Sequence, residues 1–356
     1  MKLKNFHRSL LSKEKMLSKT FLGRDILITG GCGSIGSEIV RQLLKYKPKR
    51  IRIFDNNESG LFNIQEDLKS PLIRVLVGDI RDKERLRLAV KGVDIVFHAA
   101  ALKHVPLCEY NPFEAINTNV IGTQNLVEVS REEQVSKLIA ISTDKAVNPI
   151  NTMGATKLLA EKLVMTADIG ENCKTKFSCV RFGNVLNSVG SVIPIFKRQI
   201  KEGGPVTITS TNMVRFFMSM SEAVALVLKT ASLSNGRDIF ILKMRKIMIL
   251  DLAEIMIEKM APKYRYDPKD IKIKVIGVRP GEKVDEYLVT DEEKENLIDL
   301  GNLSVLKIPK MIPNKKLKHK RFISRINNQN INDGKILSKQ EVKVLLDRYN
   351  LCDPEF

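Results

Sequence analysis

Residues 29–36 read TGGCGSIG and join an apolar run, DILI, to an amphipathic segment, SEIVRQLLKY. This glycine spacing between a strand and a helix is typical of a dinucleotide-binding loop. Gly30 permits the tight turn, Gly33 lets backbone amides approach a pyrophosphate, and Gly36 lets the helix pack close to the sheet. Asp55 ends the next apolar run, 19 residues after Gly36, where a carboxylate can bind the hydroxyls of an adenosine ribose.

The chain around this loop alternates short apolar runs with helical patterns. The runs include RIRIFD, IRVLVGD, VDIVFHAAA, KLIAIST and FSCVRFG. Runs rich in β-branched residues and separated by helices indicate βαβ units and a parallel sheet that is buried on both faces. The predicted fold class is α/β: a doubly wound parallel sheet of the Rossmann type, with a smaller C-terminal α/β lobe that binds substrate.

The spacing of these runs loosens after about residue 184. We expect a dinucleotide-binding domain over residues 20–183 and a nucleotide-sugar-binding lobe over 184–311, within which the chain could return to the first domain. Residues 312–356 are expected to form a loose basic segment followed by a final helix. Ser338 followed by Glu341 predicts a capping box at the start of that helix.

The composition limits the functional class. The 356 residues are 43% hydrophobic and 28% charged, and no apolar run approaches the ~18 residues that cross a bilayer. The N-terminus lacks the pattern of a signal peptide, so we expect a cytoplasmic protein. Five cysteines without a C-x-x-C pair or suitably spaced histidines argue against a disulfide framework and against a zinc site.

The net charge of +18 raises nucleic acid and anionic membranes as partners. Most positive residues are spread along the whole chain, and only residues 2–15 and 313–321 are concentrated enough to touch phosphate or a membrane surface. Stacking aromatics do not alternate with these charges and Trp is absent. We therefore expect no nucleic-acid partner and leave peripheral membrane contact through the basic ends open.

Other predicted strand ends meet at the same edge of the sheet. Asp79 could contact the adenine or cap the next helix. Ala99 and Ala100 are small enough to leave room for the dinucleotide, although close helix packing would also demand small residues. Asn119 could tie neighbouring loops together.

The carboxylate of Asp55 also bears on which cofactor binds. It would repel a 2′-phosphate and no Arg directly follows it, which favours NAD over NADP. Arg52, Arg81 or a Lys from elsewhere could still reach such a phosphate.

The reacting end is expected at residues 142–157, STDKAVNPINTMGATK. The strand before them should deliver Thr143, Asp144 and Lys145 to the carboxyl edge of the sheet. Lys157 can hold a nicotinamide ribose and lower the pKa of nearby acids. Met153 stands where nicotinamide enzymes often have a Tyr, and a thioether cannot exchange a proton. Plainer alternatives are a helix cap for Asp144, a solvated charge for Lys145 and core packing for Met153.

Seven motifs together carry a family resemblance: TGGCGSIG, HAAALKHVP, STDKAVNPINTMGATK, RFGNV, GSVIP, VRFFMS and RPGEKVDE. From about residue 20 to about residue 310 the chain resembles an extended short-chain dehydrogenase/reductase. More narrowly, it resembles the inverting UDP-N-acetylglucosamine 4,6-dehydratases of polysaccharide biosynthesis. The resemblance implies a UDP-sugar substrate, a tightly bound and recycled NAD or NADP, and a homo-oligomer.

The resemblance also implies a reaction. The sugar is oxidised at C4, water is eliminated across C5 and C6, and hydride returns to C6. Lys145 would remove the C5 proton, as a buried Lys that is neutral near pH 7, and Asp144, with a pKa raised by burial, would protonate the leaving C6 hydroxyl. Retaining relatives carry Asp-Glu at these positions, so Lys145 predicts inversion at C5. Thr143, Asp144 or a water held by Lys157 would take the C4 proton.

The same resemblance assigns the binding residues. Arg215 and Arg279 would grip the diphosphate, and the other predicted substrate residues are Lys103, His104, Asn184, Val192 and Glu282. The predicted cofactor residues are Thr29, Gly30, Gly33, Ser34, Ile35, Gly36, Asp55, Asp79, Ile80, Ala99, Ala100, Lys103, Asn119 and Lys157.

Two departures from the family bear on which sugar the protein binds. Asn187 and Val189 replace a Gly and an Arg of many relatives, and the sequence before Arg215 also differs. A UDP-sugar epimerase and a catalytically silent protein that binds dinucleotide or UDP-sugar are the alternatives.

Overall fold

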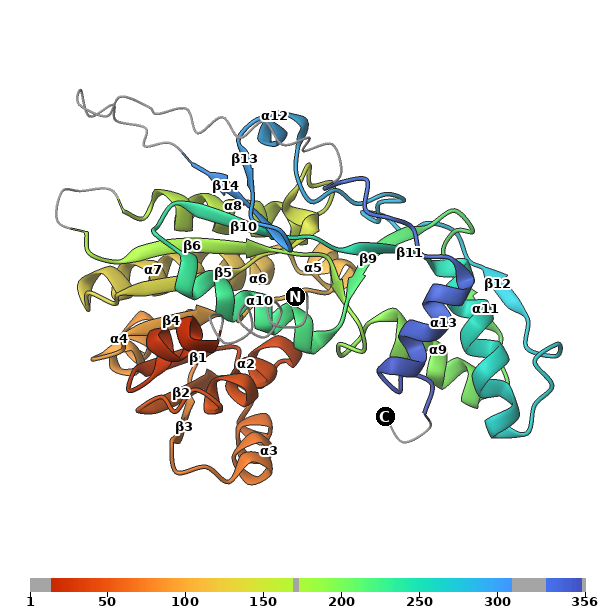
Figure 1. Ribbon diagram of the computed structural model, residues 1–356, viewed down its shortest axis with the longest axis horizontal. Coiled ribbons are helices and arrows are strands. Elements are labelled where there is room, and N and C mark those ends of the chain that lie inside the picture. Colours follow the sequence, from red (N-terminus) through yellow and green to blue (C-terminus); the bar gives the residue numbers. More distant parts are fainter. Residues whose placement is uncertain (1–13, 169–172, 309–330, 354–356) are drawn as a thin grey trace, which may run out of the picture.

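The computed structural model describes residues 14–168, 173–308 and 331–353 (Figure 1). Its centre is a nine-stranded sheet in the order β13-β14-β10-β6-β5-β4-β1-β2-β3. The parallel strands are β1 (Asp25–Thr29), β2 (Arg50–Asp55), β3 (Ile73–Val77), β4 (Ile95–His98), β5 (Lys137–Ile141), β6 (Lys176–Arg181) and β10 (Asp238–Leu242). Strands β14 (Leu303–Lys307) and β13 (Leu297–Asp299) extend one edge in antiparallel fashion. The predicted α/β fold with a large parallel sheet is confirmed.

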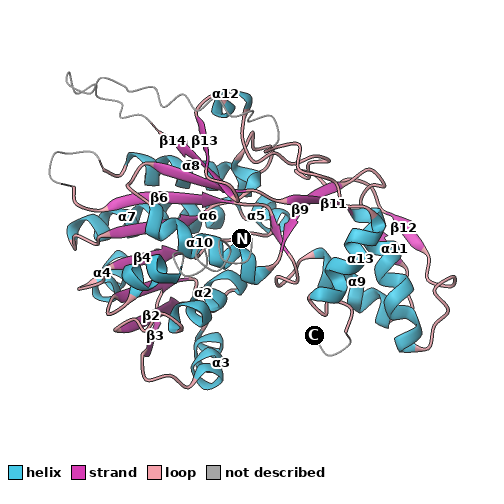
Figure 2. Ribbon diagram, viewed as in Figure 1, coloured by secondary structure: helices cyan, strands magenta, loops and turns pink. Residues whose placement is uncertain are grey.

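Helices cover both faces of this sheet (Figures 1 and 2). Helices α2 (Ser34–Leu44) and α10 (Met220–Leu233) pack against each other, and α3 (Glu58–Leu68) packs against β2 and β3. Helices α4 (Lys83–Val90), α7 (Gly122–Glu132) and α8 (Thr152–Thr166) form a second layer. Every residue of β1 and of β10 is buried, which explains why these strands read as continuous apolar runs.

The connection from β4 to α7 is helical as well. It contains α5 (Val105–Tyr110), α6 (Pro112–Ile116) and a π-helical turn (Asn117–Ile121), all of which pack against α8. After β5, a single 3₁₀ turn (Asp144–Ala146) leads to α8. These two connections carry most of the predicted reacting residues to the carboxyl edge of the sheet.

A smaller lobe is built around its own apolar core (Figure 2). Strands β7 (Asn184–Val185), β9 (Val214–Met218) and β11 (Arg245–Met248) form one small sheet, and β8 (Val206–Ile208) pairs with β12 (Ile273–Val275). Helix α11 (Ile249–Met260) packs against α9 (Val192–Lys201) and α13 (Lys339–Arg348), and continues into a 3₁₀ turn (Ala261–Tyr264). The chain crosses back to the main sheet at β10 and, after α12 (Asp291–Lys294), at β13 and β14.

The capping box predicted for the last helix is confirmed, because Ser338 and Glu341 cap each other's backbone at the start of α13. Nearly all of the basic N-terminal segment and the whole of 313–321 lie outside the described residues. Within the described parts of the chain, no helix is both long enough and apolar enough to span a membrane.

Candidate functional site

A pocket of about 820 Å³ lies at the carboxyl ends of the parallel strands, the edge where open α/β sheets bind ligands. Strand ends form one part of its wall, and residues 182–185 and 188–191, which lie between β6 and α9, form another. Most of the predicted site residues line it: Gly30, Gly33, Ser34, Ile35, Gly36, Asp55, Asp79, Ile80, Ala99, Ala100, Lys103, His104, Thr143, Lys145, Met153, Lys157 and Asn184.

The glycine-rich turn has no room for side chains. Gly30 has a φ of +67°, and a Cβ there would lie 2.5 Å from the backbone nitrogen of Ala100. A Cβ on Gly36 would lie 2.2 Å from the carbonyl oxygen of Gly30. Gly33 is the N-cap of α2 and provides no side-chain cap, so the N–H groups of the first helical turn remain available to an anion. The turn therefore fits the phosphates of a dinucleotide.

Asp55 closes this turn from the end of β2. Its Oδ2 accepts a hydrogen bond from the N–H of Cys32 at 3.0 Å, and its Oδ1 accepts one from the N–H of Asn57 at 3.0 Å. A carboxylate has about four lone-pair sites, so both oxygens can accept further bonds from ribose hydroxyls.

Asp79 holds Arg81 beside the pocket. The guanidinium of Arg81 lies 2.7 Å from Asp79 and 2.7 Å from Glu114. The idea that Asp79 caps the next helix is wrong, because Asp82 is the residue that caps α4. Arg52 donates to two carbonyls at the C-terminal end of α4, so it is occupied elsewhere.

Two predicted cofactor residues, Thr29 and Asn119, lie behind the lining of the pocket. Thr29 is fully buried, with its Oγ1 2.7 Å from Nδ1 of His98. Asn119 bonds both backbone groups of Leu102 and the hydroxyl of Thr156. It therefore ties the loop after β4 to helix α8, as the sequence suggested.

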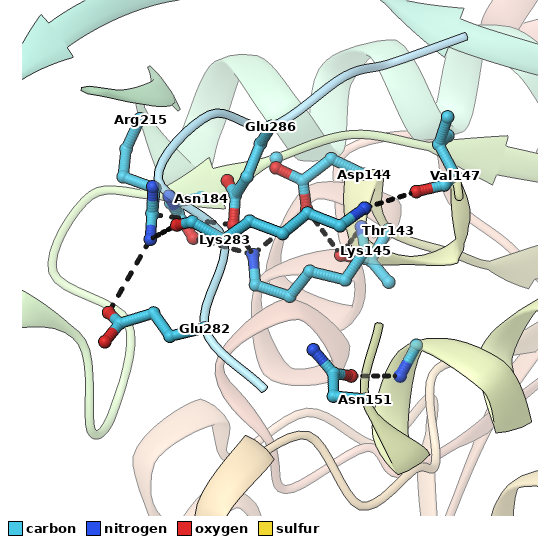
Figure 3. A network of polar contacts seen from close by, with 12 residues as sticks. Thr143, Asp144, Lys145, Val147, Asn151, Asn184, Arg215, Glu282, Lys283 and Glu286 are labelled. Atoms are coloured by element: carbon cyan, nitrogen blue, oxygen red, sulfur yellow. Dashed lines mark hydrogen bonds and ion pairs between the residues drawn. The ribbon is translucent and has the colours of Figure 1, made fainter. Parts of the chain in front are cut away.

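The predicted reacting residues converge at the end of β5 (Figure 3). Lys145 Nζ lies 3.0 Å from Asp144 Oδ1 and 2.7 Å from Glu286 Oε1. The hydroxyl of Thr143 donates to Asp144 Oδ1 at 2.8 Å. Asp144 is fully buried, and Thr143 rather than Asp144 caps the 3₁₀ turn. The helix-cap alternative for Asp144 and the solvated alternative for Lys145 are therefore both wrong.

Burial and neighbouring charges set the proton affinities in this cluster. Burial and the charge of Glu286 raise the pKa of Asp144 to about 7, against the opposing charge of Lys145. Burial lowers the pKa of Lys145, but the charges of Asp144 and Glu286 outweigh it and raise this pKa above its usual value. The expectation of a neutral Lys145 is thus wrong for this conformation, while the raised pKa of Asp144 is as expected.

Met153 and Lys157 lie on the first turns of α8. Met153 is buried against Cys108 and Ala115 and also lines the pocket, so it is both a core residue and part of the site. Lys157 Nζ donates to the carbonyl of Ile141 at 2.7 Å, and burial lowers its pKa.

The predicted sugar-binding residues stand on both sides of the pocket. Lys103 Nζ donates to the carbonyl of Val189 at 2.7 Å, and burial lowers its pKa. His104 packs so closely on Gly190 that a Cβ there would lie 2.5 Å from its ring. Asn184 Oδ1 lies 3.5 Å from Lys145 Nζ. Val192 begins α9, outside the lining.

The predicted diphosphate arginines do not line the pocket. Arg215 donates to the carbonyls of Lys283 and Val284, and lies 3.6 Å from Glu282. In this conformation it clamps the RPGEKVDE loop. Arg279 is exposed, and its backbone N–H donates to Glu282.

Sequence reasoning missed Glu286, the last residue of the RPGEKVDE motif. The loop is held over the site by two further contacts, from Lys283 Nζ to the carbonyl of Val147 and from Asn151 Nδ2 to the carbonyl of Gly281. Three acids and two bases within eight residues were the only available signal, and such a charge run usually marks a solvated loop.

Comparison with known proteins identifies the family of this chain. Residues 26–307 match the family described as polysaccharide biosynthesis protein. The chain belongs to the polysaccharide biosynthesis protein family.

Family relatives carry different names. An uncharacterized membrane protein, MJ1061, of Methanocaldococcus jannaschii is 55% identical over 93% of this chain and 97% of its own length. An inverting UDP-N-acetylglucosamine 4,6-dehydratase of Campylobacter jejuni is 42% identical, and a UDP-glucose 4-epimerase of Rickettsia bellii is 43% identical, each over 79% of this chain and 82% of its own.

A solved structure, Pen from Bacillus thuringiensis, superposes with a TM-score of 0.84 at 38% identity, covering 92% of this chain and 98% of that one. The resemblance drawn from the motifs is confirmed at the level of the family.

The chain departs from the sequence of many relatives at the pocket rim. Val189, which replaces an Arg, is 72% exposed and lines the pocket. Its N–H donates to the hydroxyl of Ser34. Asn187 takes a left-handed backbone with a φ of +57°, which suits the Gly of the relatives.

Proposed function

We propose that this chain is a nucleotide-sugar 4,6-dehydratase that converts UDP-N-acetylglucosamine with inversion at C5, for the synthesis of a surface polysaccharide or glycan. The pairing of Asp144 with Lys145 carries the proposal. Elimination of water needs an acid and a base next to each other, and these two groups lie 3.0 Å apart, with Lys145 in the lining of the pocket and Asp144 buried beside it. The 42% identity with the Campylobacter dehydratase supports the same reaction and substrate.

The residues of the pocket fit a nicotinamide dinucleotide. The glycine turn would hold its pyrophosphate, Asp55 its adenosine ribose and Lys157 its nicotinamide ribose. When bound, this group would supply hydride-transfer chemistry for the oxidation at C4 and the reduction at C6. The carboxylates of Asp55, Asp79 and Glu114 line the pocket and Arg81 is already paired with two of them, which favours NAD over the more negative NADP.

A proton route through the chain's own residues replaces the missing Tyr. Met153 cannot take the proton of the C4 hydroxyl. A water held by Lys157 can take this proton, because Lys157 lines the pocket and burial lowers its pKa. Asp144, already in its acid form, gives its proton to the C6 hydroxyl, which leaves as water. Lys145 must first lose a proton of its own before it removes the C5 proton, because the charges of Asp144 and Glu286 favour its ammonium form. Reprotonation of C5 on the opposite face inverts that centre.

Turnover of UDP-N-acetylglucosamine tests the proposal, with NAD present and with part of the reaction run in deuterated water. We expect loss of one water by mass spectrometry, and a C6 methyl group with deuterium at C5 by proton NMR. The C5 coupling constants report inversion. Asp144→Asn should lower kcat by ~10²- to 10⁴-fold and leave NAD binding intact. A retained water, or an Asp144→Asn variant as fast as the wild type, contradicts the dehydratase assignment.

A UDP-sugar 4-epimerase is the second candidate, favoured by the 43% identity with the Rickettsia epimerase. It would share the pocket and the oxidation at C4. The same experiment separates the two, because an epimerase changes the stereochemistry at C4 without changing the mass. Bound cofactor without turnover of any UDP-sugar would instead indicate a silent binder.

We also propose that the protein forms a homo-oligomer through the helices that cover α8. Four large apolar side chains are more than half exposed there: Leu107, Tyr110, Phe113 and Leu159. Helices α5, α6 and α8 pack together, so these residues can form one surface patch. Light scattering should show a multimer, and Tyr110→Lys with Phe113→Lys should dissociate it. A monomeric wild type contradicts this proposal.

A further inference from the structure

Glu286 is a buried acid that no step above uses. The RPGEKVDE loop inserts it between the reacting pair and Arg215 (Figure 3). Its Oε1 lies 2.7 Å from Lys145 Nζ and 3.5 Å from Arg215 Nε. The residue is only 4% exposed. A carboxylate this far from water is costly unless charged partners surround it, so its position at the pair calls for an explanation.

Two buried oxygens in the cluster lack hydrogen-bond partners among the described residues: Asp144 Oδ2 and Glu286 Oε2. The two carboxyl groups lie side by side, because both bind the same ammonium, Lys145 Nζ, through Asp144 Oδ1 at 3.0 Å and Glu286 Oε1 at 2.7 Å. Two ionised carboxylates can only accept, so neither can satisfy the other. One proton placed between them supplies a donor and satisfies both oxygens at once.

We propose that Asp144 and Glu286 share one proton, and that Glu286 is the positioning residue that keeps Asp144 in its acid form and anchors Lys145 beside it. The catalytic part of this inference rests on the proposed dehydratase function. The shared proton itself does not.

The charges around the pair decide which member holds the proton. The charged groups that face it from the packed elements are Lys145 after β5, Arg215 on β9 and Lys283 on the loop. Lys145 and Arg215 lie against Glu286 and lower its pKa despite its burial, so Glu286 stays ionised. Asp144 accepts from Thr143 and Lys145 through Oδ1 only, which leaves Oδ2 to carry the proton towards Glu286.

The pH dependence of kcat tests this arrangement. In the wild type we expect kcat to fall on the alkaline side of about pH 7, where Asp144 loses its proton. Glu286→Gln removes the negative charge and offers an amide donor to Asp144, and both changes favour ionised Asp144. This alkaline limb should therefore move to lower pH by about one unit or more, and kcat above pH 7 should fall at least about tenfold. Glu286→Asp keeps the charge and should bring the limb back towards the wild type.

Asp285→Asn is the matched control, because Asp285 is the exposed neighbour of Glu286 and makes the same acid-to-amide change. It should leave kcat and the limb unchanged. A structural role for Glu286 alone would lower kcat at every pH without moving the limb. That result, or an equal shift in Asp285→Asn, overturns the proposal.

Infrared difference spectroscopy gives a readout that does not need turnover. The band of a protonated buried carboxyl should be present in the wild type below about pH 7, absent in Asp144→Asn, and should titrate at lower pH in Glu286→Gln. If these shifts occur but no UDP-sugar is converted, the shared proton stands and the proposed function fails. If turnover occurs and the band titrates alike in the wild type and Glu286→Gln, the function stands and the shared proton is refuted.

Discussion

Gly183 sets the position of the proposed acid, and Gly183→Ala tests this directly. The residue follows β6, and a Cβ there would lie 2.7 Å from Asp144 Oδ2 and 2.7 Å from Phe216 Cβ. Ordinary contact begins at 3.4 Å, so each neighbour is about 0.7 Å too close. Phe216 is fully buried on β9 and cannot retreat, whereas the Asp144 carboxyl can rotate. The new methyl group should therefore displace the carboxyl by most of 1 Å.

The size of this displacement sets the expected effect. A misplacement of about 1 Å at reacting groups costs ~10²-fold in rate, so kcat should fall by ~10- to 100-fold. Overpacking of the site should lower the free energy of unfolding by ~1–3 kcal/mol. Binding of NAD should be unchanged, because the glycine turn at residues 29–36 is not disturbed.

Steady-state turnover of UDP-N-acetylglucosamine, NAD binding by fluorescence and thermal melting measure these three quantities. Gly92→Ala is the control, because a Cβ at Gly92 meets nothing within 4 Å and only the positive φ of +69° strains the backbone. It should melt at a lower temperature than the wild type with kcat unchanged. A kcat of Gly183→Ala within twofold of the wild type refutes the reasoning, since it would mean that the site absorbs the methyl group without moving Asp144.

Three other perturbations test separate parts of the structure. The pKa of Asp144 in the folded state, about 7, lies above its unfolded value, so between about pH 4 and 7 the folded state binds an extra proton, and the stability that this proton provides is lost as the pH rises. The urea midpoint of unfolding should therefore fall from pH 4 to pH 7 in the wild type and fall less in Asp144→Asn. An equal pH dependence in both proteins would contradict this. Arg181→Leu breaks ion pairs of 2.7 Å to Glu161 and 2.8 Å to Glu293, and should lower the free energy of unfolding by ~3–5 kcal/mol because it leaves Glu161 charged and buried. The double variant Arg181→Leu with Glu161→Leu should recover most of this loss in chemical denaturation. A double variant no more stable than the single one argues against an uncompensated charge. Asp55→Ala should weaken NAD binding by about tenfold and raise the affinity for NADP relative to NAD in calorimetric titrations, whereas an unchanged ratio would show that Asp55 does not select the cofactor.

The nucleotide end of the site could be predicted because its signals are local. The turn at residues 29–36 and Asp55 belong to one βαβ unit, and their backbone geometry follows from glycine spacing and strand length. The reacting pair was also predictable, since adjacent residues at the end of a parallel strand must reach the carboxyl edge together.

The contacts made by the RPGEKVDE loop could not be predicted in the same way. Arg215 reads as a free diphosphate clamp, yet its donors are used by loop carbonyls. Glu286 reads as one charge of a solvated loop, yet it is buried beside Lys145. Each depends on a partner that is remote in sequence, and periodicity carries no information about such pairs.

The sequence by itself determined the α/β class, the glycine turn and the placement of Asp144 and Lys145 at the carboxyl edge of the sheet, because these follow from short-range patterns of side chains. Only the tertiary structure decided the protonation of the pair. Burial alone would lower the pKa of Lys145, but the charge of its neighbour Asp144 and that of Glu286, which the fold brings within 2.7 Å of its ammonium, together raise this pKa. Proton affinity in a buried site depends on every charge nearby, and which charges are near is a property of the folded chain.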